Sequence, residues 1–441
     1  MKPANVIFRE MVLLAAPLIF GNILQQLYNA ADSIIIGRFL GGYAFAATGV
    51  SGSLMNLFIF VLSGCCTGVS IILAQQYGGK EYAEYRQEFF VAVIAGLGFT
   101  IVLSIVGTMF LGPILQLMHT PDELLEYSAE YLRIILLGIP VTFLYNLFAA
   151  VLRSIGNTRA ALFFLILAVV CNIALDYLFI VLFHLGVAGA AWATIIAQLL
   201  SAILSLFYVR GTISHLLFTR TDMRINRRLL QKTAYFGLVS ALQQSSLYVG
   251  KLLVMGMVNN LGTASIAAYT ATMRIEGFVN TLGEGGSVAS SVLIAQNYGT
   301  GNWENIRRTY GVSICTHLVA GSIFSFLLYL SADPASRLFL GDTGETIIQL
   351  CAAYLKCISF FYVLNFIGCA FNGYFRGVGR VSIPTIGSTI HISLRVLLTY
   401  YLASRFDIIA VAIATGIGWV SVVIFDCLCY FRTSRMQDAV G

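Results

Sequence analysis

Long runs of apolar residues, separated by short polar segments, recur along the whole 441-residue chain. Each run has close to the roughly 20 residues that an α-helix needs to cross a hydrocarbon core about 30 Å thick. The pattern predicts twelve membrane-spanning helices, over residues 11–36, 48–74, 88–112, 126–150, 160–183, 187–210, 233–258, 264–294, 309–331, 346–372, 382–403 and 407–431. The expected fold is therefore an all-α integral membrane protein.

The composition agrees with this prediction, because 58% of the residues are hydrophobic and only 10% are charged. Soluble domains have about 25% charged residues. If the N-terminus is inside, the inner loops and tails hold 18 Lys and Arg residues and the outer loops hold 3. This positive-inside bias predicts a cytoplasmic membrane protein with both termini in the cytoplasm. The net charge of +6 could suggest a nucleic-acid partner, but the location of the charges argues against it and indicates a lipid bilayer. We expect a monomer.

Polar signatures of the first half recur in the second half at a nearly constant offset. The stretch Ala74-Gln-Gln-Tyr-Gly78 returns as Ala295-Gln-Asn-Tyr-Gly299. Similarly, Leu152-Arg-Ser-Ile-Gly156 returns as Phe375-Arg-Gly-Val-Gly379. The offset that carries Ala74 onto Ala295 is almost the same as the one that carries Leu152 onto Phe375, and we call it the repeat separation. The sequence therefore predicts one six-helix unit in two copies.

The duplication predicts three parts: an N-lobe, a basic cytoplasmic linker and a C-lobe, at residues 1–210, 211–232 and 233–441. Because six is an even number, both copies enter the bilayer from the same side. We therefore expect a pseudo-two-fold axis along the membrane normal. In such parallel-repeat transporters the substrate site lies between the two bundles near the middle of the membrane.

Four polar residues on three spans of the first half are expected at a similar depth: Asp32, Asn172, Asp176 and Thr194. Asn172 and Asp176 are four residues apart and share one helix face. A carboxylate inside a membrane is costly and usually functional. Carboxylate, amide and hydroxyl oxygens suit a hard cation, and two neighbouring carboxylates can also share a proton. The set predicts a coupling site for Na+ or H+.

The second half departs from this pattern. At the repeat separation Asn172 corresponds to Arg395, and the slightly smaller local offset that carries Gly37 onto Gly256 carries Asp32 onto Lys251. Fixed cations thus replace two of the predicted ion-binding residues, and we expect ion coupling only in the first half. The residues expected to join these cations in a charge network with a substrate or switching role are Arg274, Glu276 and Glu284.

Two further features suggest how such a protein could work. Gln25 and Gln26 correspond in position to Gln243 and Gln244, and we expect both pairs to face the substrate cleft. Pro17 lies within the first span, where it removes a backbone hydrogen bond and should bend the helix. The bend is either a hinge that responds to ion binding at Asp32 or a static kink.

These features together resemble the multidrug and toxic compound extrusion (MATE) transporters of the MOP flippase superfamily. The resemblance rests on the duplicated halves, on the Arg-x-x-Gly sequence after the fourth and tenth spans, and on Asn172-Ile-Ala-Leu-Asp176-Tyr177. It covers essentially the whole chain from Pro17 to the twelfth span. It implies a secondary antiporter that exports organic, cationic or amphipathic compounds in exchange for Na+ or H+ by rocking its two bundles.

The resemblance also assigns individual residues. It places Asp32, Asn172, Asp176 and Thr194 at the N-lobe site for the cation or proton. It further implies a backbone contribution and two supporting polar side chains, from Ala190, Tyr131 and Asn146.

The sequence argues against several other classes of function and leaves one main alternative. The chain has no GxxxxGK phosphate loop and no GxSxG or HExxH motif, so we expect no ATP-driven transport, no catalytic residues, no cofactor and no enzyme. A channel would need a filter loop repeated around a pore. The main alternative within the superfamily is a flippase or exporter of an anionic or lipid-linked substrate, which would use the cationic C-lobe.

Overall fold

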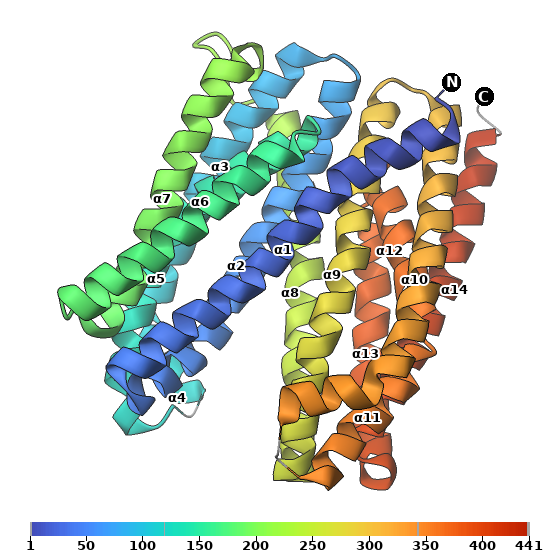
Figure 1. The fold of residues 1–441 in the computed structure, drawn as a ribbon. Helices are drawn as coiled ribbons and strands as arrows, with labels where there is room; N and C mark the ends of the chain where they lie inside the picture. Colours follow the sequence, from blue (N-terminus) through green and yellow to red (C-terminus); the bar gives the residue numbers. More distant parts are fainter. Residues whose placement is uncertain (1, 119, 342–343, 439–441) are drawn as a thin grey trace. The chain divides into compact units, whose positions relative to one another are not determined.

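The computed structural model describes residues 2–118, 120–341 and 344–438, and these residues are almost entirely helical (Figure 1). The α-helices are α1 (Ala4–Leu40), α2 (Gly42–Gly78), α3 (Tyr82–Met109), α4 (Leu111–Leu117), α5 (Asp122–Ser154), α6 (Thr158–Asp176), α7 (Gly186–Thr212), α8 (Arg227–Val258), α9 (Thr263–Gly299), α10 (Trp303–Leu340), α11 (Glu345–Ser359), α12 (Tyr362–Gly377), α13 (Ser382–Phe406) and α14 (Ile409–Asp438). A π-helical segment and two 3₁₀ turns complete the structure, as η1 (Tyr177–Leu182), η2 (Ser214–Leu216) and η3 (Asn259–Leu261).

The all-helical, multi-span membrane architecture is confirmed. In the described part of the chain eight helices are long and apolar enough to cross a membrane: α1, α2, α3, α5, α6 with η1, α7, α10 and α14. The bent pair of α11 and α12 makes a ninth. Helices α8, α9 and α13 have 32, 37 and 25 residues. They correspond to three further predicted spans, but they contain the charged residues of the second half.

Two of the predicted spans are less regular than expected. The predicted span over 346–372 is two helices, α11 and α12, which meet at an angle of 52°. The Ser359 hydroxyl donates to the Lys356 carbonyl just before the break, a bond that often bends helices. Phe361 lies at the break between α11 and α12, and a Cβ atom on Gly416 of α14 would lie 2.5 Å from its ring. The predicted span over 160–183 continues beyond α6 as the π-helical segment.

The chain forms two compact units whose limits fall inside helices. One unit is Phe20–Ala241, and the other combines Met1–Ile19 with Leu242–Gly441. The first part of α1 therefore packs with the second half of the chain, and the first part of α8 packs with the first half. The predicted lobes thus exchange the beginnings of their first helices.

The unit formed by Phe20–Ala241 is built around α5, which packs against α2, α3 and α7, while α6 packs against α7 (Figure 1). Two glycines of α2 bring the first part of α8 very close. A Cβ atom on Gly64 would lie 2.5 Å from the Cα of Ala241. A Cβ atom on Gly68 would lie 2.3 Å from the carbonyl oxygen of Phe236. Only glycine allows this backbone contact.

The predicted linker is held against the start of α3. The Nε of Arg86 donates to Asp222 at 3.0 Å, and Gln87 donates to the carbonyl of Arg224 at 3.3 Å. Desolvation acts against ionisation of Asp222, but hydrogen bonds from Thr219 and Arg86 hold its pKa below the usual value. The ion pair is therefore retained at neutral pH, and the linker is an ordered part of this unit.

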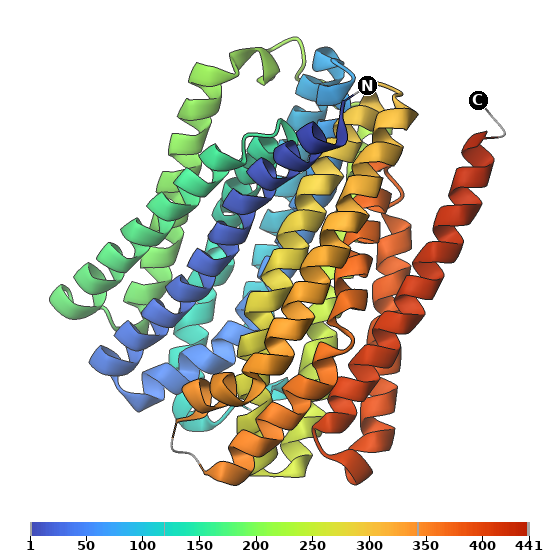
Figure 2. The same cartoon turned by 45° about the vertical axis from the view of Figure 1, so that its right-hand side comes forward.

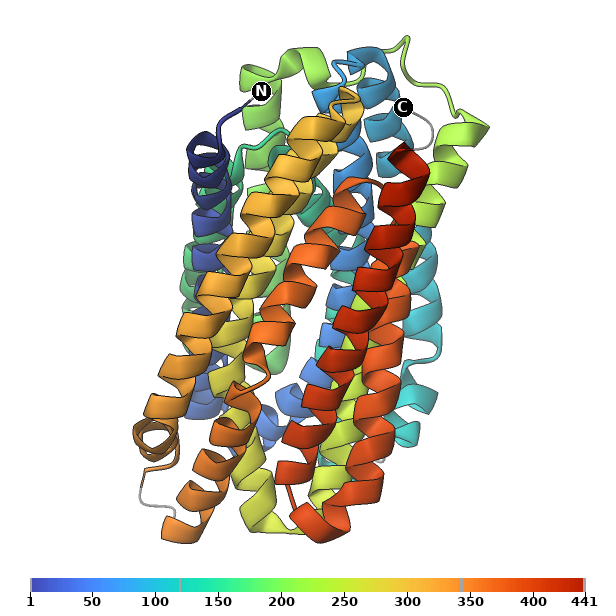
Figure 3. The same ribbon diagram turned by 90° about the vertical axis from the view of Figure 1, so that its right-hand side faces the viewer.

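In the other unit α9 packs against α10 and α12, and α13 runs beside α14 (Figures 2 and 3). The first part of α1 contributes Met11 and Leu14, which pack with Ala289 and Leu293 of α9. A Cβ atom on Gly285 would lie 2.4 Å from the side chain of Ile19. The repeat separation relates Gly285 to Gly64, so both halves use an equivalent glycine at this crossing.

We predict that Gly64→Ala lowers the free energy of unfolding by about 1–3 kcal/mol, because the new methyl group meets backbone atoms that cannot rotate away. The apparent melting temperature of the purified protein in detergent measures the effect. The matched control is Gly49→Ala in the same helix, where a Cβ atom would have no neighbour within 4 Å. That variant should be as stable as the wild type or slightly more so, and an equal loss in both variants would contradict the prediction.

Candidate functional site

Three helices of the unit Phe20–Ala241 bring the predicted ion-binding residues together. Asp176 is the last residue of α6 and is fully buried. Asn172 lies one turn earlier on the same face and is also buried. Thr194 comes from α7, and the half-buried Asp32 comes from α1. The residues expected at a similar depth thus lie in one cluster.

The carboxyl groups of Asp32 and Asp176 face each other within hydrogen-bonding reach. The Asn172 amide, oriented to satisfy both of its partners, donates to Asp176 at 2.9 Å and accepts from the Thr194 backbone N–H at 3.1 Å. One oxygen of each carboxyl, the Oδ1 atom, is buried without a hydrogen-bond partner among the described residues. These two oxygens, with the amide and the hydroxyl nearby, fit a shared proton or a Na+ ion.

A second ring of contacts holds Thr194 in place. Its hydroxyl donates to the carbonyl of Ala190 at 3.1 Å and lies 3.3 Å from the hydroxyl of Tyr28. Tyr131 is 4% exposed and interacts electrostatically with Asp32 and Asp176. Tyr131 therefore lies close to the carboxyl pair, and the Ala190 carbonyl contacts Thr194.

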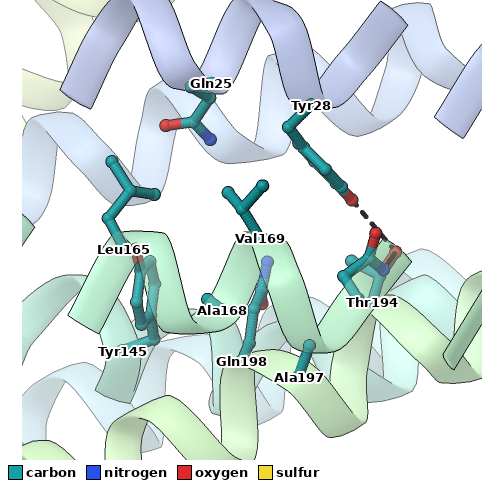
Figure 4. Close-up of a pocket in the computed structure, with 10 residues that line it drawn as sticks. Gln25, Tyr28, Tyr145, Leu165, Ala168, Val169, Thr194, Ala197 and Gln198 are labelled. Carbon is teal, nitrogen blue, oxygen red and sulfur yellow. Dashed lines mark hydrogen bonds between the residues drawn. The ribbon is translucent and has the colours of Figure 1, made fainter. Parts of the chain in front are cut away.

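A small pocket opens next to this cluster, with a volume of about 30 Å³. That is room for roughly two water molecules. Figure 4 shows that Gln25 and Tyr28 of α1 face residues of α6 and α7 across it, and that the Tyr28 hydroxyl points to Thr194. The residues that line the pocket are Gln25, Tyr28, Tyr145, Leu165, Ala168, Val169, Asn172, Thr194, Ala197 and Gln198. Water can thus reach Asn172 and Thr194.

Comparison with known proteins identifies the family. The family model described as MatE matches residues 17–178 and 240–401, which together make up more than half of the chain. The chain belongs to the MatE family. The two matched segments begin at residues 17 and 240, an offset that agrees with the repeat separation. This MATE protein is therefore a multi-pass membrane transporter and not an enzyme.

Curated relatives and solved structures agree with this assignment. The "Probable multidrug resistance protein YoeA" of Bacillus subtilis (strain 168) is 28% identical over 394 residues, covering 87% of this chain and 84% of that protein. A structure described as the outward-facing conformation of a multidrug resistance MATE family transporter of the MOP superfamily has a TM-score of 0.90, 22% identity and coverage of 98% and 97%. A MOP superfamily transporter from Pyrococcus furiosus has a TM-score of 0.89, 23% identity and coverage of 99% of both chains. At these identities the structures show the fold.

Two further residues predicted in the first half of this MATE transporter lie away from the carboxyl pair. Asn146 is fifteen residues beyond Tyr131 on α5, about 22 Å along the helix. Its amide donates to the carbonyl of Thr142 at 2.8 Å, within its own helix. Pro17 lies inside α1, which is unbroken from Ala4 to Leu40. The chain passes between the two compact units three residues after Pro17.

The charged residues of the second half form a cluster around Glu276 of α9, which is 9% exposed. Arg395 of α13 and Lys251 of α8 interact electrostatically with its carboxyl group. Arg395 also donates to the hydroxyl of Tyr269 at 3.1 Å. Glu284 interacts with Lys251 and is exposed. The predicted charge network is thus centred on one buried acid.

Other residues predicted to act with this network lie elsewhere. Gln243 is 2% exposed, and its amide accepts from Arg376 at 2.8 Å and donates to Ser388 at 3.1 Å. It is a buried connector between helices, whereas we expected it to face a cleft. Gln244 is half-buried. Gln26 and Arg274 are exposed, and so is Gln25, which lines the pocket beside the carboxyl pair.

Sequence reasoning did not assign several residues that the structure brings to these sites. Arg376, which holds Gln243, belongs to the repeated Arg-x-x-Gly signature, so its polar contact could have been anticipated. Tyr354 and Tyr362 lie within hydrogen-bonding reach of Glu276. The signal for Tyr354 was its correspondence with Tyr131 at the repeat separation.

We predict that Asn172→Ala lowers the free energy of unfolding by about 1–3 kcal/mol, because buried Asp176 loses its amide donor. Asn146→Ala is the matched control. Its amide donates to a carbonyl of its own helix, and its removal should cost about 0.5–1.5 kcal/mol or less. Thermal unfolding of both variants in detergent compares the two losses. A larger loss in Asn146→Ala would show that Asn172 does not support the carboxyl pair.

Proposed function

We propose that this MATE transporter is a secondary antiporter that exports organic, cationic or amphipathic compounds in exchange for Na+ or H+. The observation that supports the proposal best is the Asp32–Asp176 pair, in which each carboxyl keeps one buried oxygen without a partner among the described residues. Such a pair has to be neutralised by a proton or a cation, since an uncompensated charge inside a membrane is costly. Ion coupling requires a group that takes up an ion from the solution outside, and the Asp32–Asp176 pair meets this requirement.

The pocket beside the pair supports competition between ion and substrate. Asn172 and Thr194 belong both to the ion cluster and to the pocket wall. When an ion arrives, Asp176 and the Asn172 amide turn toward it, and the polar lining available to a substrate changes. Thermodynamic linkage then makes each ligand weaken the binding of the other. This antagonism is sufficient for exchange.

The class of substrate follows from the pocket and from the relatives. Tyr28 and Tyr145 offer aromatic faces, and Gln25 and Gln198 offer amide groups, which suit contacts with flat, amphipathic molecules. The pocket of about 30 Å³ would have to widen as the bundles rock before such a molecule could enter. An organic cation would also be attracted by the nearby carboxyl pair. YoeA, with 28% identity, carries the name of a probable multidrug resistance protein.

The direction of exchange follows from the positive-inside bias. With both termini in the cytoplasm, the end of α1 that carries Asp32 lies toward the outer side, where the driving ion is more concentrated. Alternating access by rocking of two bundles would then carry the substrate outward and the ion inward. The two helices that pass from one compact unit to the other, α1 and α8, are the places where such a motion must be absorbed.

An anionic or lipid-linked substrate is the second candidate. It is favoured by the exposed cations Lys251 and Arg274 in the second half. The structure of the Pyrococcus furiosus relative is described with the words "reverse polarity of binding pocket suggests different function". These words, said of a protein with the same fold, support keeping the second candidate.

Asp32→Asn should reduce ion-driven export at least about tenfold, which corresponds to about 1.4 kcal/mol of lost coupling. The amide keeps the size of the side chain but cannot accept the ion or the proton. The assay follows a fluorescent organic cation in proteoliposomes under a Na+ gradient alone and a pH gradient alone. The gradient that drives the wild type identifies the coupling ion.

Glu81→Gln, an exposed acid outside the site, is the control and should transport normally. Full activity of Asp32→Asn would refute coupling through the carboxyl pair. If the folded wild type moves no cation under either gradient, the same assay with an anionic dye and with a lipid pyrophosphate tests the second candidate.

Pro17→Ala should slow export several-fold if Pro17 is a hinge, because the restored hydrogen bond stiffens α1 by up to about 3 kcal/mol. Ion-dependent thermal stabilisation should remain, since the carboxyl pair is intact. Pro140→Ala is the matched control, because Pro140 is also inside a helix but α5 lies wholly within one compact unit. Wild-type export by Pro17→Ala would mean that the proline only kinks the helix.

A further inference from the structure

The ion cluster of the first half has a structural counterpart in the second half. The repeat separation relates Tyr131 to Tyr354, and both are buried, at 4% and 0% exposure. It also relates Thr194 to Thr415, and each of these threonines follows an alanine. The Thr194 hydroxyl donates to the carbonyl four residues earlier at 3.1 Å, and the Thr415 hydroxyl does so at 2.6 Å. Both halves therefore contain the same arrangement of a buried tyrosine and a hydrogen-bonded threonine, which we call the frame of the site.

The acid has moved to a different position within this duplicated frame. In the first half Tyr131 donates to the sulfur of Met55 at 3.6 Å. The offset that carries Thr194 onto Thr415 also carries Met55 onto Glu276, and Tyr354 lies within hydrogen-bonding reach of Glu276. The same two positions are thus in contact in both halves, but only the second half has a carboxyl group there.

A permanent cation faces this acid. The offset that carries Tyr131 onto Tyr354 carries Asn172, the residue that bonds the acid in the first half, onto Arg395. The Arg395 guanidinium donates to Tyr269 and interacts electrostatically with Glu276. Its Nε atom and the hydroxyl of Thr399 are buried without a hydrogen-bond partner among the described residues. Polar groups for a small ligand are therefore present around Arg395.

The ionisable side chains that surround Glu276 come from five helices. They are Lys251 of α8, Tyr269 of α9, Cys351 and Tyr354 of α11, Tyr362 of α12 and Arg395 of α13. Among these, Lys251 and Arg395 carry a positive charge, and Lys251 is exposed whereas Arg395 is partly buried. Arg395 is therefore the main compensating charge for the buried acid.

We propose that Arg395 is a tethered cation, which fills in the second half the place that the coupling ion takes in the first half. This inference rests on the proposed function of the Asp32–Asp176 pair. An arginine side chain stays protonated in proteins, so Glu276 never has to take up an ion from solution. The second half then keeps the frame of an ion site without exchanging ions, and one site rather than two couples to transport.

The decisive variant is Arg395→Asn, because it installs the residue that Asn172 provides in the first half. It is made in the Asp32→Asn background, where the first site no longer responds to ions. The buried Glu276 loses its compensating charge and should recruit Na+ or H+ from solution. At saturating ion the apparent melting temperature should rise by roughly 2 °C or more above its value without the ion.

The measurement uses full-length protein purified in detergent. The melting temperature is recorded in NaCl against choline chloride at fixed ionic strength, and over a series of pH values. Arg395→Lys in the same background is the matched control, since it keeps a tethered cation and should gain no ion response. Adding Glu276→Gln to Arg395→Asn should remove both the instability and the ion response.

The Glu276→Gln variant also separates binding from simple unfolding. If Arg395→Asn is poorly stable, recovery of its stability by Na+ or low pH is the expected result. Instability that neither the ions nor Glu276→Gln relieve would overturn the proposal. The same response in Arg395→Lys would overturn it too, because a tethered charge would then not suffice.

The outcomes distinguish this inference from the proposed function. If Asp32→Asn loses the wild-type ion response and Arg395→Asn creates none, the tethered-cation proposal fails while the antiport proposal stands. If the wild type shows no ion response but Arg395→Asn does, the antiport proposal fails while the tethered-cation proposal stands. If neither protein responds to Na+ or pH, both proposals fail.

Discussion

A carboxyl group buried in a membrane protein needs a compensating charge or proton close by, and both halves of this transporter are arranged around that need. In the first half Asp176 lies beside another acid, Asp32, and the neutral amide of Asn172. In the second half Glu276 has Arg395. Under the proposed function, the same fold thus produces one site that depends on the solution outside and one whose compensating charge is part of the chain.

The difference between the halves depends on close packing of the helix frame. Gly64 and Gly285 allow α8 and α1 to lie against α2 and α9 in equivalent ways. These crossings fix where each first helix leaves one compact unit and enters the other. Side chains near the ends of the helices, including Asp32, are then free to differ between the halves. Duplication preserved the frame, while the residues proposed to bind ions diverged.

The sequence predicted where the helices lie along the chain and how deep some side chains are, but not which way each helix face points. Hydropathy located the long helices, whereas Tyr354 was missed although the repeat separation relates it to Tyr131. Depth along the helices brought Asp32 and Asp176 together, because their position within a span is a local property. The rotation of a helix about its axis is not local. Gln243 was therefore expected in a cleft, although Arg376, far along the chain, holds it inside the bundle.

The exchanged first helices have a consequence for synthesis. The apolar face of Met11 and Leu14 finds its partners only when Ala289 and Leu293 of α9 have been made, in the second half of the chain. At translation rates of about 5–20 residues per second, the roughly 280 intervening residues take about 15 to 55 seconds. The beginning of the chain therefore waits in the lipid while almost two thirds of the protein is completed. A single six-helix copy would lack the partner of its own first helix, because the beginning of each first helix packs with the other half of the chain.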